Sequence, residues 1–188
     1  GPTPTGGHGE FTNTTFARFG ALGSRVLPYY AAGAVWEAGA TVETTMSVRA
    51  NHGGGWQYRL CPRASELTEA CFQQTPMDFA RDSRMTLKNG TTIDLTSTFV
   101  TDGTLPMGGT WVMNPIPCSS DMQGGLAYQF EPPCDETTPP GHLTEGVCSG
   151  EWITNITVHD YLRVPEHLEA GDYVLGFRWD CESSAQVW

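Results

Sequence analysis

Three consecutive glycines between two stretches of alternating residues constrain the fold of this chain most. Residues 42–49 alternate between apolar or small side chains and polar ones, and residues 56–60 place Trp, Tyr and Leu at every second position. Because successive side chains of a strand lie on opposite faces, both patterns predict strands with one face toward a core. The glycines at 53–55 follow His52 and leave the backbone beside its imidazole without side-chain cover. The alternative is a glycine-rich turn with an incidental histidine.

The rest of the chain repeats the period of two and favours an all-β fold. Further strands are expected within residues 84–95, 110–113, 151–164 and 173–180. Asn89-Gly90 predicts a hairpin with a two-residue type I′ turn, and we expect the strand after it to continue toward Phe99. With 22 Gly, 13 Pro and no long helical periodicity, the composition favours an all-β sandwich with long loops.

The domain organisation is expected to be a single β-sandwich over residues 1–188. A length of 188 residues suits one domain with a sizeable core. Residues 114–150 are rich in Pro, Gly and Cys without a period, and we interpret them as a loop insertion. Residues 1–28 read as loop, and the chain stops on an apolar stretch, so we expect the C-terminal part of a longer domain.

Cysteines and glycosylation sequons indicate a secreted protein. Three N-x-T sequons begin at Asn13, Asn89 and Asn155. Together with an even number of cysteines they favour a disulfide-bonded, extracellular glycoprotein with N-linked glycans. Cys61 and Cys71 are expected to pair locally. All six cysteines are disulfide candidates, and their spacing matches no zinc pattern: Cys61, Cys71, Cys118, Cys134, Cys148 and Cys181.

The charge excludes some partners. The formal net charge is −11 and the sequence pI is about 4.7. Nucleic acid and anionic membrane surfaces are therefore unfavourable partners. The chain also contains no apolar run of about 18 residues, so we expect no membrane span.

Two segments together resemble a known family. One comprises residues 42–62, 67–72 and 76–79, and the other comprises residues 168–188. Both are similar to the chitin-binding type-4-like group of lytic polysaccharide monooxygenases of algae and other protists. The resemblance covers much of the chain outside residues 114–150. It implies an immunoglobulin- or fibronectin-like β-sandwich that binds one copper ion and cleaves a cellulose- or chitin-like polysaccharide oxidatively.

The resemblance also implies roles for particular residues. In that family a histidine brace holds the copper: the N-terminal histidine supplies its amine and one ring nitrogen, and an internal histidine supplies a third nitrogen. His52 matches the internal ligand, and imidazole suits copper. Gln186 matches the polar residue that orients the oxygen species, and Trp188 falls where the family usually has an axial Tyr or Phe.

The substrate would lie across the glycine-rich face. That face comprises Gly53, Gly54, Gly55 and Trp56. Trp56 or Tyr58 would be a platform for a sugar ring. Core packing is the alternative for both residues, and we favour it for Tyr58.

The front of the chain departs from the family pattern. Residue 1 is Gly, so the first residue as given does not supply a brace histidine. We expect that ligand to lie upstream; cleavage after Gly7, which would make His8 terminal, is the weaker alternative.

Other functions stay open beside the oxidase. A non-catalytic glycan-binding module and a structural protein of an extracellular matrix or filament would both suit a secreted β-sandwich. A glycosidase needs two facing carboxylates, and the aspartates show no such arrangement in the sequence. His159 and Asp160 read as a pair at a strand end without a companion nucleophile.

Overall fold

The computed structural model describes residues 15, 18, 21–47, 50–51, 54–87, 89–115, 143–144, 147–148, 150–151 and 156–180. The chain divides into two units, Gly1–Val35 and Trp36–Trp188, and each is considered by itself. In the first unit, the described residues form one short helix, α1 (Gly23–Val26), which buries none of its side chains.

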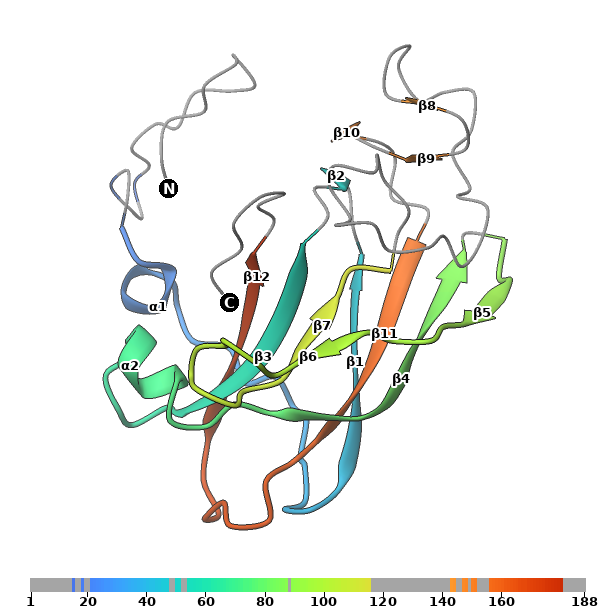
Figure 1. Cartoon of the computed structure of the whole chain (residues 1–188). Helices are drawn as coiled ribbons and strands as arrows, with labels where there is room; N and C mark the ends of the chain where they lie inside the picture. The colour runs from blue at the N-terminus through green and yellow to red at the C-terminus, as the bar shows by residue number, and fades with distance from the viewer. Residues whose placement is uncertain are drawn as a thin grey trace. The chain divides into compact units, whose positions relative to one another are not determined.

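The second unit contains two four-stranded antiparallel sheets (Figure 1). The first sheet has the order β1 (Thr41–Ser47), β11 (Ile156–Arg163), β4 (Asp78–Leu87) and β5 (Thr92–Asp94). The second sheet has the order β12 (Tyr173–Asp180), β3 (Gly55–Pro62), β7 (Trp111–Met113) and β6 (Phe99–Val100). The predicted all-β sandwich is confirmed.

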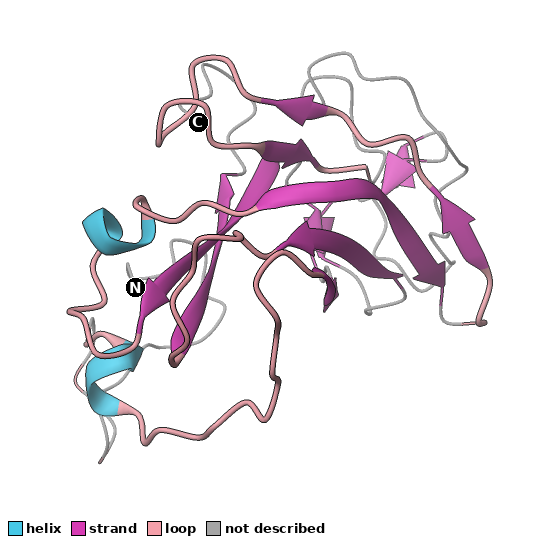
Figure 2. Ribbon diagram, turned by 90° about the horizontal axis from the view of Figure 1, so that it is seen from below, coloured by secondary structure: helices cyan, strands magenta, loops and turns pink. Residues whose placement is uncertain are grey.

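Smaller elements complete the second unit. β2 (Ala50–Asn51) pairs with β10 (Gly150–Glu151), and β8 (Leu143–Thr144) pairs with β9 (Val147–Cys148). One short helix, α2 (Glu69–Phe72), joins β3 to β4. Strands account for most of the regular structure that Figure 2 shows. β8, β9 and the start of β10 fall within the predicted insertion, whose residues 116–142 lie outside the described part of the chain.

The core lies between the inner faces of the two sheets. The predicted alternation holds in β1, where every second side chain is partly buried, and the predicted apolar face of β3 is buried. The buried cluster comprises Trp56, Tyr58, Leu60, Met77, Met85, Leu95, Val112, Ile156, Val158, Leu162 and Val164. At the hydrophobic effect's usual strength, each such side chain stabilises the fold by about 1.5–3 kcal/mol.

Two local predictions about the hairpin are wrong. Gly90 N donates to Leu87 O, and Leu87 N donates to Thr91 O, each at 2.8 Å. These bonds close a three-residue loop in which Gly90 has a φ of 85°, whereas a type I′ turn would have two central residues. The strand after the turn does not continue to Phe99. It ends at Asp94, and β6 joins the second sheet instead.

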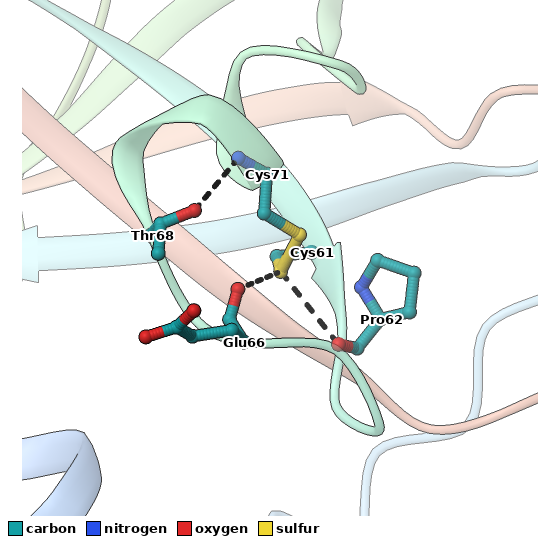
Figure 3. Close-up of a disulfide and its surroundings, with 5 residues drawn as sticks. All are labelled: Cys61, Pro62, Glu66, Thr68 and Cys71. Atoms are coloured by element: carbon teal, nitrogen blue, oxygen red, sulfur yellow. Dashed lines mark hydrogen bonds between the residues drawn. A yellow bond between two sulfur atoms is a disulfide. The ribbon is translucent and has the colours of Figure 1, made fainter.

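One predicted disulfide is confirmed. Cys61 ends the buried part of β3 and bonds to Cys71 in α2, with a Cα–Cα distance of 5.6 Å (Figure 3). Thr68 precedes α2, and its side-chain oxygen accepts a hydrogen bond from Cys71 N at 3.3 Å. That bond satisfies one of the free N–H groups at the start of the helix. The disulfide and the cap together hold α2 against β3.

Replacing Cys61 and Cys71 together with alanine is expected to lower the free energy of unfolding by about 2–3 kcal/mol, because the disulfide restricts the unfolded chain. Urea unfolding followed by tryptophan fluorescence measures the change. Ser65→Ala, at an exposed position inside the same loop, is the control and should leave the midpoint unchanged. An unchanged midpoint in the double variant would contradict the pairing.

Candidate functional site

The loop predicted to carry the metal ligand is described at both of its ends. Asn51 belongs to β2 and pairs with Gly150 of β10. On the other side, Gly54 O accepts a hydrogen bond from Asn114 N at 2.9 Å, immediately before β3 begins. His52 and Gly53 lie outside the described residues. β2 therefore ends directly before His52, and β3 begins at Gly55, three residues after it.

The second family-like segment leaves the sheet at the same place. β12 is antiparallel to β3, and its last residue, Asp180, is the register partner of Gly55, the first residue of β3. Gln186 and Trp188 follow beyond Asp180, outside the described residues. The structure thus brings together the ends of the two segments that were predicted to form one site. It does not place His52, Gln186 or Trp188 themselves.

Three of the four residues of the predicted substrate face are buried. Gly54 and Gly55 are buried, and Trp56 has no exposed area. The reason is that β3 is a central strand: it pairs with β12 on one side and β7 on the other, and its inner face packs into the core. A sugar ring stacks on an exposed aromatic face, so the prediction that Trp56 serves as a platform is wrong.

The described part of the chain contains no metal-binding cluster. Among those residues, no group of three or more His, Cys, Asp or Glu side chains could hold an ion. The described helices include none that is long and apolar enough to cross a membrane.

The predicted modification sites are partly described. Asn89 is exposed at the tip of the β4–β5 hairpin, and its side-chain oxygen accepts a hydrogen bond from Thr91 N at 2.9 Å. This position is accessible for a glycan, and glycosylation stays a prediction. Asn13, Asn155, Cys118, Cys134 and Cys181 lie outside the described residues, as does the side chain of Cys148.

Sequence reasoning missed a polar network inside the core. Asp160 is fully buried and accepts three hydrogen bonds from side chains of both sheets. Trp56 Nε1 and Tyr58 OH donate to Oδ2 at 2.8 and 2.9 Å, and Ser83 Oγ donates to Oδ1 at 2.6 Å. A signal was present in the sequence, since Asp160 continues the inward-facing series Ile156, Val158 and Leu162 of β11.

Burial dominates the electrostatics of this network. It raises the pKa of Asp160, although the hydrogen bonds from Ser83, Trp56 and Tyr58 act in the opposite direction. Burial also raises the pKa of Tyr58, and the charge of Asp160 adds to that shift. Because the network joins β11 and β4 to β3, we interpret it as a polar link that fixes how the two sheets face each other.

A second polar cluster covers the outer face of β3. Arg59 is 5% exposed and forms a close ion pair with Glu69 of α2, which also accepts a hydrogen bond from Arg178 at 3.3 Å. The hydrogen bond from Arg59 lowers the pKa of Glu69. Phe72 packs directly over Gly176, where a Cβ atom would lie 2.8 Å from its ring. Glycine is therefore required for α2 to approach β12 this closely.

The prediction for His159 is also wrong. His159 lies inside β11 rather than at its end, and its ring contacts Thr86 of β4 and Glu43 of β1. Its chain neighbour Asp160 points to the opposite face, into the core. Strand pairing between distant segments supplies the companion hydroxyl that the local sequence does not contain.

Comparisons with known proteins identify no relative: no family model, curated protein or solved structure matches this chain.

Proposed function

We propose that this chain forms the β-sandwich of an extracellular protein that cleaves a polysaccharide by copper-dependent oxidation. The observation that supports the proposal is the pairing of Gly55 with Asp180. It places Gly55, three residues after His52, opposite Asp180, six residues before Gln186. An oxidase site built from these two segments requires this proximity.

The proposed roles follow from side-chain chemistry. His52 would supply one imidazole nitrogen to copper, and bound copper would supply the redox chemistry. The amide of Gln186 would hold a small polar ligand beside the ion through hydrogen bonds. The ring of Trp188 would exclude water from one side. The polysaccharide, cellulose- or chitin-like, would contact the loops around His52, since Trp56 and its neighbouring glycines are buried.

Copper binding by the intact protein tests the proposal. We expect one Cu(II) to bind, with an electron paramagnetic resonance signal showing nitrogen ligands, and we expect His52→Ala to abolish that signal. His167→Ala is the matched control, because His167 is an exposed loop histidine, and its signal should match that of the unmodified protein.

Two results would contradict the oxidase. One is an intact protein that gives no copper signal, and the other is a His52→Ala variant of it that binds copper as the unmodified protein does. Either result would leave the second function class, a glycan-binding or structural extracellular glycoprotein. Retention on cellulose or chitin would distinguish the glycan-binding member of that class.

A further inference from the structure

Three neighbouring strands of the first sheet bring a carboxylate, an imidazole and a hydroxyl together on its outer face. Glu43 Oε1 lies 2.5 Å from His159 Nδ1, and His159 Nε2 lies 2.9 Å from Thr86 Oγ1. The residues come from β1, β11 and β4 in that spatial order. The side chain of His159 is 20% exposed and that of Glu43 is 48% exposed, so the imidazole is sheltered yet accessible.

The three groups lie in the order of a catalytic triad: the Thr86 hydroxyl as nucleophile, the His159 imidazole as base and the Glu43 carboxylate that orients the imidazole. In the neutral imidazole, a carboxylate that accepts a hydrogen bond from Nδ1–H leaves Nε2 as an acceptor, and Nε2 of His159 faces the Thr86 hydroxyl. Nε2 then accepts the hydrogen bond from Thr86, which makes the hydroxyl oxygen more nucleophilic. All three groups lie on strands, whose backbones hold them in fixed register.

A hollow of about 290 Å³ lies beside this array. Its lining residues are Arg81, Asp82, Ser83, Arg84, Asp94, Leu95 and Tyr161. Arg84 connects the hollow to the array, because it is also the register partner of His159 on β4. Arg84 Nε pairs with Asp94, another lining residue of the hollow, at 2.8 Å.

The chemistry of the hollow indicates the kind of group that it accepts. The guanidinium of Arg81 lies 3.6 Å from the centre of the Tyr161 ring, so stacking holds its N–H donors in place. Asp82 and Asp94 offer carboxylate oxygens beside these donors. Hydroxyl groups both donate and accept hydrogen bonds, so a hydroxyl-rich group such as a single sugar suits this mixture and this volume.

We propose that Thr86, His159 and Glu43 form an acyl-transfer site that hydrolyses carboxylic esters of hydroxyl-rich alcohols, with the alcohol part in the hollow. Thr86 Oγ attacks the ester carbonyl while His159 Nε2 takes its proton, and the alcohol leaves with that proton. Water then attacks the acyl-Thr86 ester, with His159 again taking and returning the proton, and the carboxylic acid is released. Arg84 provides N–H donors near the developing oxyanion.

Hydrolysis of p-nitrophenyl acetate by the full chain in EDTA tests this proposal. We expect a burst of p-nitrophenol and an acetyl group on Thr86, located by peptide mass spectrometry. Thr86→Ala and His159→Ala should each remove the catalysed rate, while Thr86→Ser should retain it. Glu43→Gln should slow it about 100-fold, within the range usual for proton-transfer groups.

Thr45→Ala is the matched control, because Thr45 is an exposed threonine directly opposite His159 on β1. It should leave the rate unchanged, and thermal unfolding should show that all variants fold. A rate that survives in both Thr86→Ala and His159→Ala, an acetyl group on another residue, or no burst at all would overturn the site. EDTA removes copper, so the outcome is independent of the oxidase proposal.

Discussion

Replacing Asp160 with alanine is expected to lower the free energy of unfolding by about 4 kcal/mol. The substitution leaves three buried donors, on Trp56, Tyr58 and Ser83, without their acceptor, and each unsatisfied donor costs about 1–3 kcal/mol. Such a loss is a large part of the 5–15 kcal/mol that stabilises a typical domain. Denaturant unfolding at neutral pH measures the loss, and Asp102→Ala, at an exposed turn position, controls for the removed charge.

Asp160→Asn is expected to cost much less than the alanine substitution. The amide oxygen accepts from the Trp56 indole and the Tyr58 hydroxyl, and the amide N–H₂ donates to Ser83, whose hydroxyl can reverse its role. An asparagine variant as unstable as the alanine variant would contradict the hydrogen-bond explanation. It would show instead that the charge of the carboxylate is required.

The stability difference between the unmodified protein and Asp160→Asn should depend on pH, and its direction can be predicted. Because burial raises the pKa of Asp160 above its ordinary value of 3.8, the folded state holds the proton more tightly than the unfolded state. The stability contributed by the protonated Asp160 is fully present below its ordinary pKa of 3.8 and is lost as the pH rises through the pKa of the folded state. The unmodified protein should therefore lose stability relative to Asp160→Asn as the pH rises from about 4. A constant difference between the two would contradict the prediction.

Replacing Glu69 with alanine is expected to lower the free energy of unfolding by about 2 kcal/mol. Breaking a buried ion pair costs about 3–5 kcal/mol, because one charge remains buried without a partner. Arg59 would be that charge, since its side chain is only 6% exposed. The expected loss of stability is smaller than this range because the side chain of Glu69 is 52% exposed, so water screens part of the interaction.

Two further variants separate charge from hydrogen bonding at Glu69. Glu69→Gln keeps an acceptor for Arg59 and should lose about half as much stability as the alanine variant. Glu37→Ala, which removes an exposed carboxylate elsewhere, should have little effect. Since Arg59 lowers the pKa of Glu69, the stabilisation is present at neutral pH and lost as the pH falls below about 4.5. Glu69→Gln should not lose this stability at acid pH. If the variant loses stability below about pH 4.5 as the unmodified protein does, Glu69 is not the cause.

Much of the fold follows from local patterns in the sequence. Period-two alternation locates β1, β3, β11 and β12, and the short loop between Cys61 and Cys71 predicts their disulfide. These features depend on residues that lie close together in the sequence, so a single sequence contains enough information to identify them. The same reasoning fails after Asp94, because alternation does not say which sheet the next strand will join.

The candidate sites depend on contacts that no local pattern contains. His159 has no nucleophile near it in the sequence, yet β4 and β1 bring Thr86 and Glu43 to its two ring nitrogens. Alternation places Trp56 on one face of β3 but does not say whether that face is exposed. Trp56 is buried because that face packs into the core. The pairing of Gly55, at the start of β3, with Asp180, at the end of β12, likewise follows from strand register.

The sequence by itself determined that this chain is an all-β protein with strands of known phase, because side-chain alternation is a property of each strand alone. Tertiary structure decided which side chains are buried on both faces, which carboxylate enters the core and which groups meet across the first sheet. The physical reason is that strand pairing and sheet packing join residues more than 100 positions apart. Thr44 pairs with Asp160 in the first sheet, and Asp160 accepts a hydrogen bond from Trp56 of the second sheet. Such contacts depend on the whole set of strands.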